Sequence, residues 1–148
     1  MSKQVHFVVN LLIVKDSKVL LEREPGKHWK FPGGHIEPGE TPIDTLHREA
    51  KEELGIEIEL LDSNLLFDGG PKVHSIPNPV QSFREEVKKD SHLNDSHVNM
   101  GMVYMVTTTD NPKPMEGQEI KWFSLDELEE GDFFKAIKKL VEMGLKTS

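Results

Sequence analysis

The sequence predicts an α/β fold in which a mixed β-sheet carries helices on its faces. Apolar segments of strand length alternate along the chain with segments of helical periodicity, an order typical of this class. The chain has 148 residues, which suits one compact domain with one buried core. It shows no internal repeat and no low-complexity tract, so residues 1–148 are expected to form a single domain.

The N-terminal segments predict a β-hairpin followed by a polar loop. Val5–Val14 is rich in Val, Leu and Ile, which indicates a buried strand. Asp16–Ser17 supplies a turn, and Lys18–Arg23 is expected to return as the second strand. Beyond the loop, Trp29–Phe31 is expected to form a short strand that ends at Pro32.

The clearest local signals predict a helix over residues 42–54. Thr41 suits the N-cap, and Pro42 suits the first helical position because its missing N–H would lack a partner there anyway. Asp44 lies where a capping box places its acid. Gly55 is expected to end the helix.

The rest of the chain is expected to alternate strands, loops and two short helices. Polar, Gly-containing or Pro-containing stretches predict loops at 68–79, 88–96 and 110–117. Ser124 is expected to cap the first helix, and the apolar spacing of the second predicts an amphipathic helix. The expected strands are Ile56–Leu61 with an extension to Phe67, Val80–Val87, Val98–Thr108 and Glu119–Phe123, and the expected helices are Leu125–Glu129 and Phe133–Met143.

Charge and composition argue against several classes of function. The net charge of −8 argues against a protein that binds polymeric nucleic acid through a basic face. The chain has no cysteine, which excludes disulfides, thiolate zinc sites and cysteine nucleophiles. The apolar N-terminal stretch is interrupted at Asn10 and Lys15, is too short to span a bilayer and has no small-residue cleavage site. We therefore expect a cytoplasmic protein that does not associate with membranes.

The predicted helix over 42–54 carries an acidic stripe. Glu49, Glu52 and Glu53 fall within about 100° of one another on a helical wheel, and the stripe borders the apolar face. Like charges at this spacing repel by about 0.2–0.5 kcal/mol per pair. Two explanations stay open here. The stripe is either a solvated face, in which Arg48 relieves the repulsion by pairing with Glu52, or the wall of a cation site.

The residues before the helix extend this stripe into a longer motif. Five residues separate Gly34 from Glu40, and seven more lead to Arg48 and the acids that follow it. The pattern Gly34–Ile56 matches G-x5-E-x7-R-E-U-x-E-E-x-G-U, where U is a bulky aliphatic residue. The chain therefore resembles the Nudix hydrolase family, of the MutT-like kind. Ala50 is the one departure, because it is smaller than the usual aliphatic residue at that position.

This resemblance implies a fold, a reaction and a partner. The fold would be an α/β/α sandwich with a mixed central β-sheet. The reaction would be divalent-metal-dependent hydrolysis of a diphosphate linkage in a nucleoside diphosphate derivative, such as a nucleoside triphosphate, ADP-ribose or a nucleotide sugar. The partner would be a small-molecule nucleotide, and a homodimer is compatible with the family. The alternative is a Nudix-fold binding or regulatory domain without catalysis.

The resemblance also assigns roles to the acidic residues. It implies that Glu49, Glu52 and Glu53 are both catalytic and metal-binding, with Glu49 acting as a ligand or as the group that orients or deprotonates water. Carboxylates are hard ligands, so Mg²⁺ or Mn²⁺ is the expected cofactor. With no cysteine and no tight histidine cluster beside the helix, zinc is not expected there. Glu119 is a further candidate ligand, and a surface glutamate is its alternative reading.

Positively charged and glycine residues complete the expected site. By resemblance, Arg48 holds the neighbouring glutamates with its planar guanidinium, and Glu40 pairs with Arg48. Gly33 and Gly34 are expected to approach the substrate and metal closely through their backbone. Arg23 could contact phosphate or be a surface arginine. His35 and His97 could approach the substrate or be ordinary polar residues.

Overall fold

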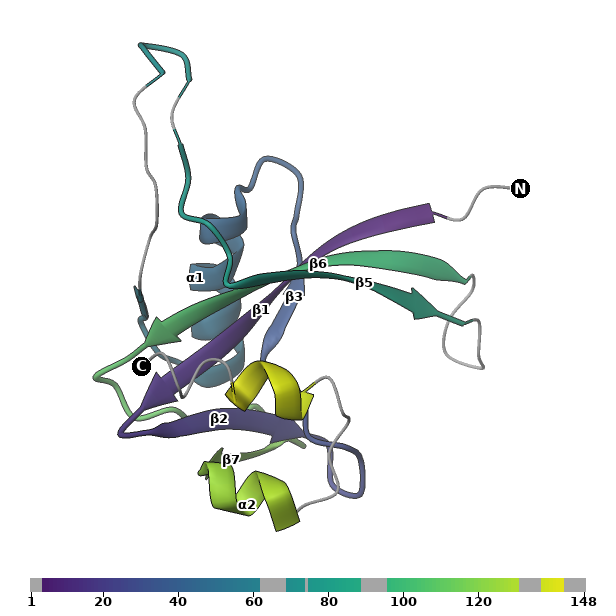
Figure 1. The fold of residues 1–148 in the computed structure, drawn as a ribbon, viewed down its shortest axis with the longest axis vertical. Coiled ribbons are helices and arrows are strands. Elements are labelled where there is room, and N and C mark those ends of the chain that lie inside the picture. The colour runs from purple at the N-terminus through teal and green to yellow at the C-terminus, as the bar shows by residue number, and fades with distance from the viewer. Residues whose placement is uncertain (1–3, 62–68, 74, 89–95, 131–136, 143–148) are drawn as a thin grey trace.

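The computed structural model describes residues 4–61, 69–73, 75–88, 96–130 and 137–142. Within this part of the chain, a mixed seven-stranded β-sheet is covered by helices on both faces, which confirms the predicted α/β class and its layers (Figure 1). Residues 137–142 form a further helical segment near the C-terminus. The named elements are β1 (Gln4–Lys15), β2 (Lys18–Arg23), β3 (Gly33–His35), α1 (Pro42–Leu54), β4 (Glu59–Leu60), β5 (Gln81–Val87), β6 (His97–Thr107), β7 (Glu119–Phe123) and α2 (Leu125–Glu130).

The sheet is organised around the long strand β1. The main strand order is β4-β6-β1-β2-β7, while β3 pairs with β1 and β5 pairs with β6. β1 and β6 run parallel, and the other pairs of described strands run antiparallel, which makes the sheet mixed. β1 pairs with β3 along its middle and with β2 near its end. β2 and β3, which carry the predicted site residues Arg23, Gly33 and Gly34, therefore both pair with β1.

Alternating side chains along β1 pack into two cores on opposite faces of the sheet. Successive side chains of a strand point to opposite faces. Val9 and Leu11 pack with Leu46 of α1 in what we call the α1-side core. Leu12 and Val14 pack in the opposite core with Leu128 of α2 and with Ile137 and Val141 of the C-terminal helical segment. α1 therefore covers one face of the sheet, and the other helices cover the second (Figure 1).

The signals read from the sequence set both ends of α1. The Thr41 side chain accepts a hydrogen bond from the N–H of Asp44, and the Asp44 carboxylate accepts one from the N–H of Thr41, so the predicted capping box is confirmed. At the C-terminal end Gly55 has a φ of 65°, the left-handed conformation that glycine adopts without steric cost. These caps fix where the acidic stripe begins and ends.

The expected strand at Trp29–Phe31 is wrong. Only Lys30 pairs with β2, through a two-way bridge to Glu22. The chain then changes partner, because the carbonyl of Pro32 accepts a hydrogen bond from Leu11 of β1 at 2.8 Å. The strand forms instead at Gly33–His35, two residues after the predicted one ends.

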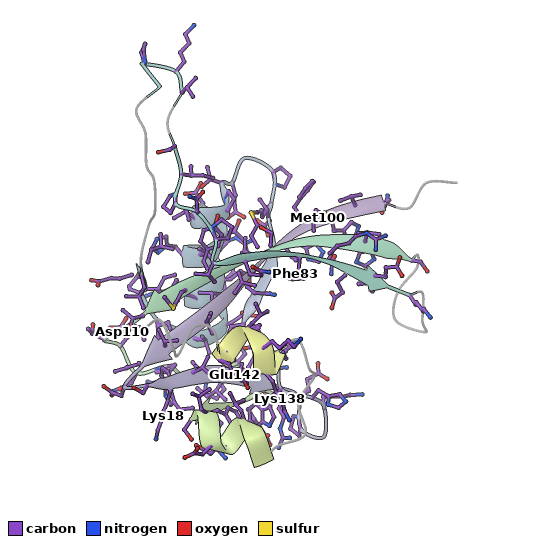
Figure 2. The ribbon with its side chains drawn as sticks, in the orientation of Figure 1. Lys18, Phe83, Met100, Asp110, Lys138 and Glu142 are labelled. Carbon is purple, nitrogen blue, oxygen red and sulfur yellow. The ribbon has the colours of Figure 1, made fainter. Side chains whose placement is uncertain are left out.

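The strand expected at Ile56–Leu61 is reduced to β4, two residues long. The backbone of Glu57 forms hydrogen bonds with side chains instead of with a neighbouring strand. Its N–H donates to Asp110 at 2.8 Å, and its carbonyl accepts from Thr108 at 2.6 Å. Asp110, which is labelled in Figure 2, thereby ties the loop after β6 to the segment that follows α1. The extension to Phe67 lies outside the described residues, as does part of the expected helix at Phe133–Met143.

The other expected elements are confirmed to within a residue or so at their ends. These are the hairpin of β1 and β2, the helix α1, the strands β5, β6 and β7, and the short helix α2.

Candidate functional site

The acidic stripe of α1 faces β3 and the end of β2. One oxygen of the Glu53 carboxyl group accepts a hydrogen bond from the main-chain N–H of Gly33 at 2.9 Å. This bond joins the last turn of the helix to the strand that carries the two glycines. The stripe is therefore only partly a solvated face, because Glu53 is turned towards the sheet.

Glu22 of β2 joins Glu53 in this site, and the sequence motif did not reveal it. Glu22 is only 3% exposed, and its carboxyl group is hydrogen-bonded to that of Glu53. The signal was the alternation along β2: Leu20 packs in the α1-side core, so Glu22, two residues further on, points to the same face. A charged residue at an inward position of a strand is unusual enough to mark a site.

Burial and mutual repulsion raise the pKa values of these acids. Desolvation, followed by the neighbouring charges of Glu22 and Glu49, raises the pKa of Glu53 to about 8. Desolvation also raises the pKa of Glu22, although the charge of Lys30 opposes the shift. The pKa of Glu49 is raised as well, mainly by desolvation and against the effect of Arg48. A bound cation would stabilise the ionised form of these three carboxyl groups.

Arg48 links the helix to the loop before it. Its guanidinium donates two hydrogen bonds to Glu40, at 2.7 and 3.0 Å, so the predicted pair is confirmed. The same group donates to Glu49 at 2.9 Å and to Glu52 at 3.2 Å. It also donates to the main-chain oxygen of His35 at 3.0 Å. Hydrogen bonding to Arg48 lowers the pKa of Glu40 to about 2, so Glu40 stays ionised.

Gly34 allows β3 to approach the Glu49 side chain. A Cβ atom built on Gly34 would overlap the carboxyl group of Glu49. Any larger residue at this position would therefore force the Glu49 side chain to shift. The expected approach of Gly33 and Gly34 to substrate and metal stays a prediction. The Glu49 side chain is only 12% exposed, and this packing keeps its carboxyl group between β3 and Arg48.

Two of the predicted site residues pair with each other instead of with the helix. Arg23 donates to Glu119 at 2.7 Å and lies over the ring of Trp29, 4.3 Å from its centroid. Arg23 follows Glu22 on β2 and so points to the other face of the strand. Within the described part of the chain, Glu119 makes its side-chain hydrogen bond and ion pair with Arg23 and not with the acids of α1. The roles of Arg23 at phosphate and of Glu119 at a metal stay predictions.

The donor chemistry of the cluster suits a hard divalent cation. Glu22, Glu49, Glu52 and Glu53 offer carboxylate oxygens, and the strand glycines add main-chain groups. Oxygen donors of this kind favour Mg²⁺ or Mn²⁺. The Glu52 side chain is 58% exposed, which leaves one acid open to a ligand that arrives from solvent.

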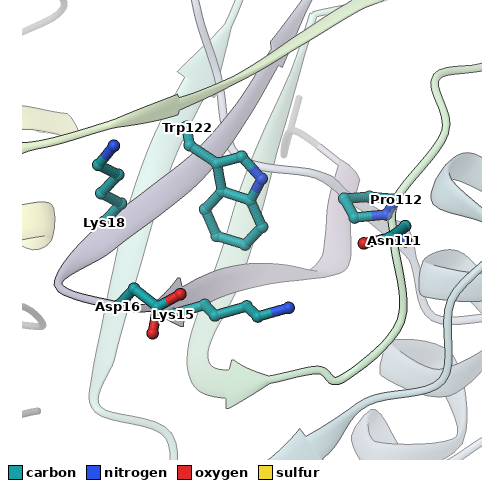
Figure 3. Close-up of a pocket in the computed structure, with 6 residues that line it drawn as sticks. All are labelled: Lys15, Asp16, Lys18, Asn111, Pro112 and Trp122. Atoms are coloured by element: carbon teal, nitrogen blue, oxygen red, sulfur yellow. The ribbon is translucent and has the colours of Figure 1, made fainter.

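A shallow open pocket lies elsewhere, beside the turn between β1 and β2. Lys15, Asp16 and Lys18 line it together with Trp122 and with Asn111 and Pro112 from the loop after β6 (Figure 3). This turn is at the opposite end of β2 from Glu22, so the pocket contains none of the acids described above.

The fold agrees with comparisons to known proteins. A family model described as the NUDIX domain matches residues 4–143, so the chain belongs to the NUDIX domain family. A NUDIX-family hydrolase from Clostridium perfringens has 29% sequence identity and a TM-score of 0.73, with 99% of each chain covered. The MutT protein from Methanosarcina mazei superposes with a TM-score of 0.65 at 20% identity, which supports the fold alone.

Curated relatives match a shorter stretch. An 8-oxo-dGTP diphosphatase from Proteus vulgaris is 36% identical over 61 residues, which are 38% of this chain and 54% of the relative. A CTP pyrophosphohydrolase from Escherichia coli is 44% identical over 55 residues, 34% of this chain and 41% of the relative. The matches therefore span about half the length of these relatives or less. Among the described residues, no helix is long and apolar enough to cross a membrane.

Proposed function

We propose that this protein is a pyrophosphohydrolase that uses Mg²⁺ or Mn²⁺ to hydrolyse a diphosphate linkage in a nucleoside diphosphate derivative. The observation that carries the proposal is the convergence of Glu49, Glu53 and the buried Glu22 beside the Gly33–Gly34 strand. In the absence of a cation this arrangement is unfavourable, as the raised pKa values of its carboxyl groups indicate. Carboxyl groups with strongly raised pKa values cluster at functional sites of proteins.

When bound, a divalent cation would neutralise phosphate oxygens and lower the pKa of a water molecule. Glu52 and Glu53 are the residues proposed to hold it, with Glu49 as a further ligand or as the group that orients or deprotonates water. Glu22 is hydrogen-bonded to Glu53, and the pKa of each carboxyl group is raised. Ligands must be deprotonated to bind a metal, so cation binding would release protons from this pair.

Arg48 serves as the positioning residue of the site. Its bonds to Glu40 anchor it on the loop before α1, while its bonds to Glu49 and Glu52 set the direction of those carboxylates. Its bond to the carbonyl of His35 fixes β3 against the helix. The Arg48 side chain thus holds α1 and β3 together, and the reacting groups would be aligned between these two elements.

Nucleoside triphosphates are the proposed first choice among substrates. Two relatives have names that describe hydrolysis of such molecules, 8-oxo-dGTP and CTP. The test is a panel of nucleoside triphosphates, ADP-ribose and nucleotide sugars, each incubated with the protein and about 5 mM Mg²⁺ or Mn²⁺, with products separated by ion-exchange chromatography. Release of a nucleoside monophosphate with pyrophosphate or a second phosphate product supports the proposal. Saturable binding without turnover on the whole panel would favour the non-catalytic binding domain.

The homodimer and the cytoplasmic location stay predictions. Sedimentation velocity of the purified protein tests the first, and localisation of a tagged protein by cell fractionation tests the second.

A further inference from the structure

Three histidines that are far apart in the sequence meet on one face of the sheet. His6 lies on β1, His35 on β3 and His97 on β6. The Nδ1 atom of His6 lies 3.2 Å from the Nε2 atom of His35. The rings of His6 and His97 stack with centroids 3.9 Å apart and planes inclined by 22°. A ring nitrogen from each of the three lies within 4.8 Å of those of the other two.

The strand register explains why they meet. His6 pairs with Asn99 in the parallel β1–β6 ladder, and paired residues point to the same face. His97 precedes Asn99 by two residues and therefore shares that face. His35 pairs with Val8 of β1, which is two residues from His6, so β3 brings it to the same side. Three strands thus place three imidazoles together.

We propose that His6, His35 and His97 bind a divalent transition-metal ion of the Zn²⁺ type, at a site separate from the carboxylate cluster. Imidazole nitrogen suits Zn²⁺, Co²⁺ and Ni²⁺, whereas Mg²⁺ requires oxygen donors. Tetrahedral Zn²⁺ with bonds of about 2.0–2.1 Å needs nitrogens about 3.3 Å apart. The His6–His35 separation of 3.2 Å already meets this requirement. The His97 nitrogen needs to approach by up to about 1.5 Å, and the His97 ring needs to turn out of its stack with His6 so that its lone pair faces the ion.

The surroundings of His6 orient it as a ligand. Its Nε2 atom lies 3.4 Å from the side-chain oxygen of Gln4. In the tautomer that donates to Gln4, the lone pair is on Nδ1, the atom that faces His35. Ligating histidines usually donate their second nitrogen to such an acceptor, which fixes both tautomer and ring orientation.

A buried amide oxygen beside the histidines lacks a hydrogen-bond donor. The Oδ1 atom of Asn99 is buried and has no partner among the described residues, although its amide nitrogen donates to Glu85 at 3.0 Å. Orphaned buried acceptors are rare because they cost free energy. A water molecule on the metal would be a suitable donor for it. Three imidazoles leave one position of a tetrahedral ion for such a water.

The site is accessible and is connected to the catalytic region. His97 is buried with 8% exposure, whereas His35 is exposed, so an ion can enter from the His35 side. The main-chain oxygen of His35 accepts the hydrogen bond from Arg48 described above. An ion bound here would therefore anchor β3, the strand that carries Gly33 and Gly34. The chemistry of the proposed hydrolysis does not require this ion.

The test is calorimetric titration of Zn²⁺ into the full-length protein, with excess Mg²⁺ present to compete at the carboxylates. We expect one equivalent of Zn²⁺ to bind to wild type and to Glu53→Gln. His35→Gln should weaken binding by about 100-fold or more, because loss of a ligand exceeds the 10–100-fold effect of losing an outer partner. His47→Gln, at an exposed histidine on α1, is the matched control and should bind as wild type does. Unchanged affinity in His35→Gln, or loss of binding in Glu53→Gln alone, would overturn the proposal.

Two further measurements do not depend on activity or on a buried substitution. Co²⁺ bound to wild type should give the strong visible absorption of a low-coordinate nitrogen site, and His6→Gln should abolish it. A weak spectrum typical of six oxygen donors would contradict the assignment. Zn²⁺ at about 100 times its Kd should raise Tm of wild type by about 5–10 °C and leave that of His35→Gln unchanged. An equal rise in both proteins would place the ion elsewhere.

Discussion

Glu53→Gln should make the metal-free protein more stable than wild type at alkaline pH. Glutamine keeps an oxygen that can accept the hydrogen bond from Gly33. It also removes a negative charge that is repelled by the charges of Glu22 and Glu49. A carboxyl group whose pKa is raised by folding keeps its proton in the native state after the unfolded chain has lost it. The free energy of unfolding of wild type therefore falls as the pH rises from 4.5 towards about 8.

The size of this effect follows from the shift in pKa. Moving the pKa of Glu53 from 4.5 to about 8 corresponds to at most about 5 kcal/mol, at about 1.4 kcal/mol per unit. Because the side chain is only partly buried, water screens a substantial part, and we expect about 2 kcal/mol. For a chain of this size, that is about 4–8 °C in Tm.

The assay is urea or thermal unfolding of both proteins in EDTA at about pH 5 and about pH 8.5. The variant should exceed wild type by about 2 kcal/mol at the higher pH and by less than about 0.5 kcal/mol at the lower. Glu52→Gln, at a side chain that is 58% exposed, is the control and should keep the pH dependence of wild type. A difference between wild type and Glu53→Gln that is the same at both pH values would refute the reasoning.

Three other substitutions probe the same site. Arg48→Lys keeps the positive charge but cannot form the two parallel hydrogen bonds to Glu40. We expect kcat/KM to fall at least about tenfold while the circular dichroism spectrum stays unchanged. Full activity would show that the guanidinium of Arg48 has no positioning role. Gly34→Ala places a Cβ against the Glu49 carboxyl group and should lower kcat by about 100-fold, so a rate equal to that of wild type would contradict the close approach. Glu22→Gln should raise Tm of the metal-free protein at alkaline pH and weaken Mg²⁺ binding by about 10-fold or more in a calorimetric titration, whereas unchanged affinity would remove Glu22 from the site.

The local signals in the sequence were sufficient for α1 and for most strands. Thr41, Pro42 and Gly55 act within a few residues of themselves, so their effects can be read without the fold. The Glu40–Arg48 pair, which the family resemblance implied, is also present in the structure. Family membership, read from the same spacing, is confirmed by the match over residues 4–143.

Contacts between distant strands could not be read in the same way. Glu22 enters the site because β2 alternates its side chains, and His6, His35 and His97 meet because of the β1–β3 and β1–β6 registers. The strand Gly33–His35 was also missed, since it is stabilised by pairing with β1 and not by the propensity of its own residues. In each case the decisive interaction joins residues far apart in the chain.

We infer that the acids around Glu53 form a cation site that drives hydrolysis of a nucleotide diphosphate linkage. The most direct test is the initial rate of hydrolysis of the best substrate as a function of Mg²⁺ concentration for wild type, Glu53→Gln and Glu59→Gln, the last at an exposed glutamate of β4. We predict a saturable Mg²⁺ dependence for wild type and Glu59→Gln, and a loss of about 100-fold or more in kcat for Glu53→Gln. Hydrolysis that needs no divalent cation, or that Glu53→Gln leaves at the wild-type rate, would contradict the claim.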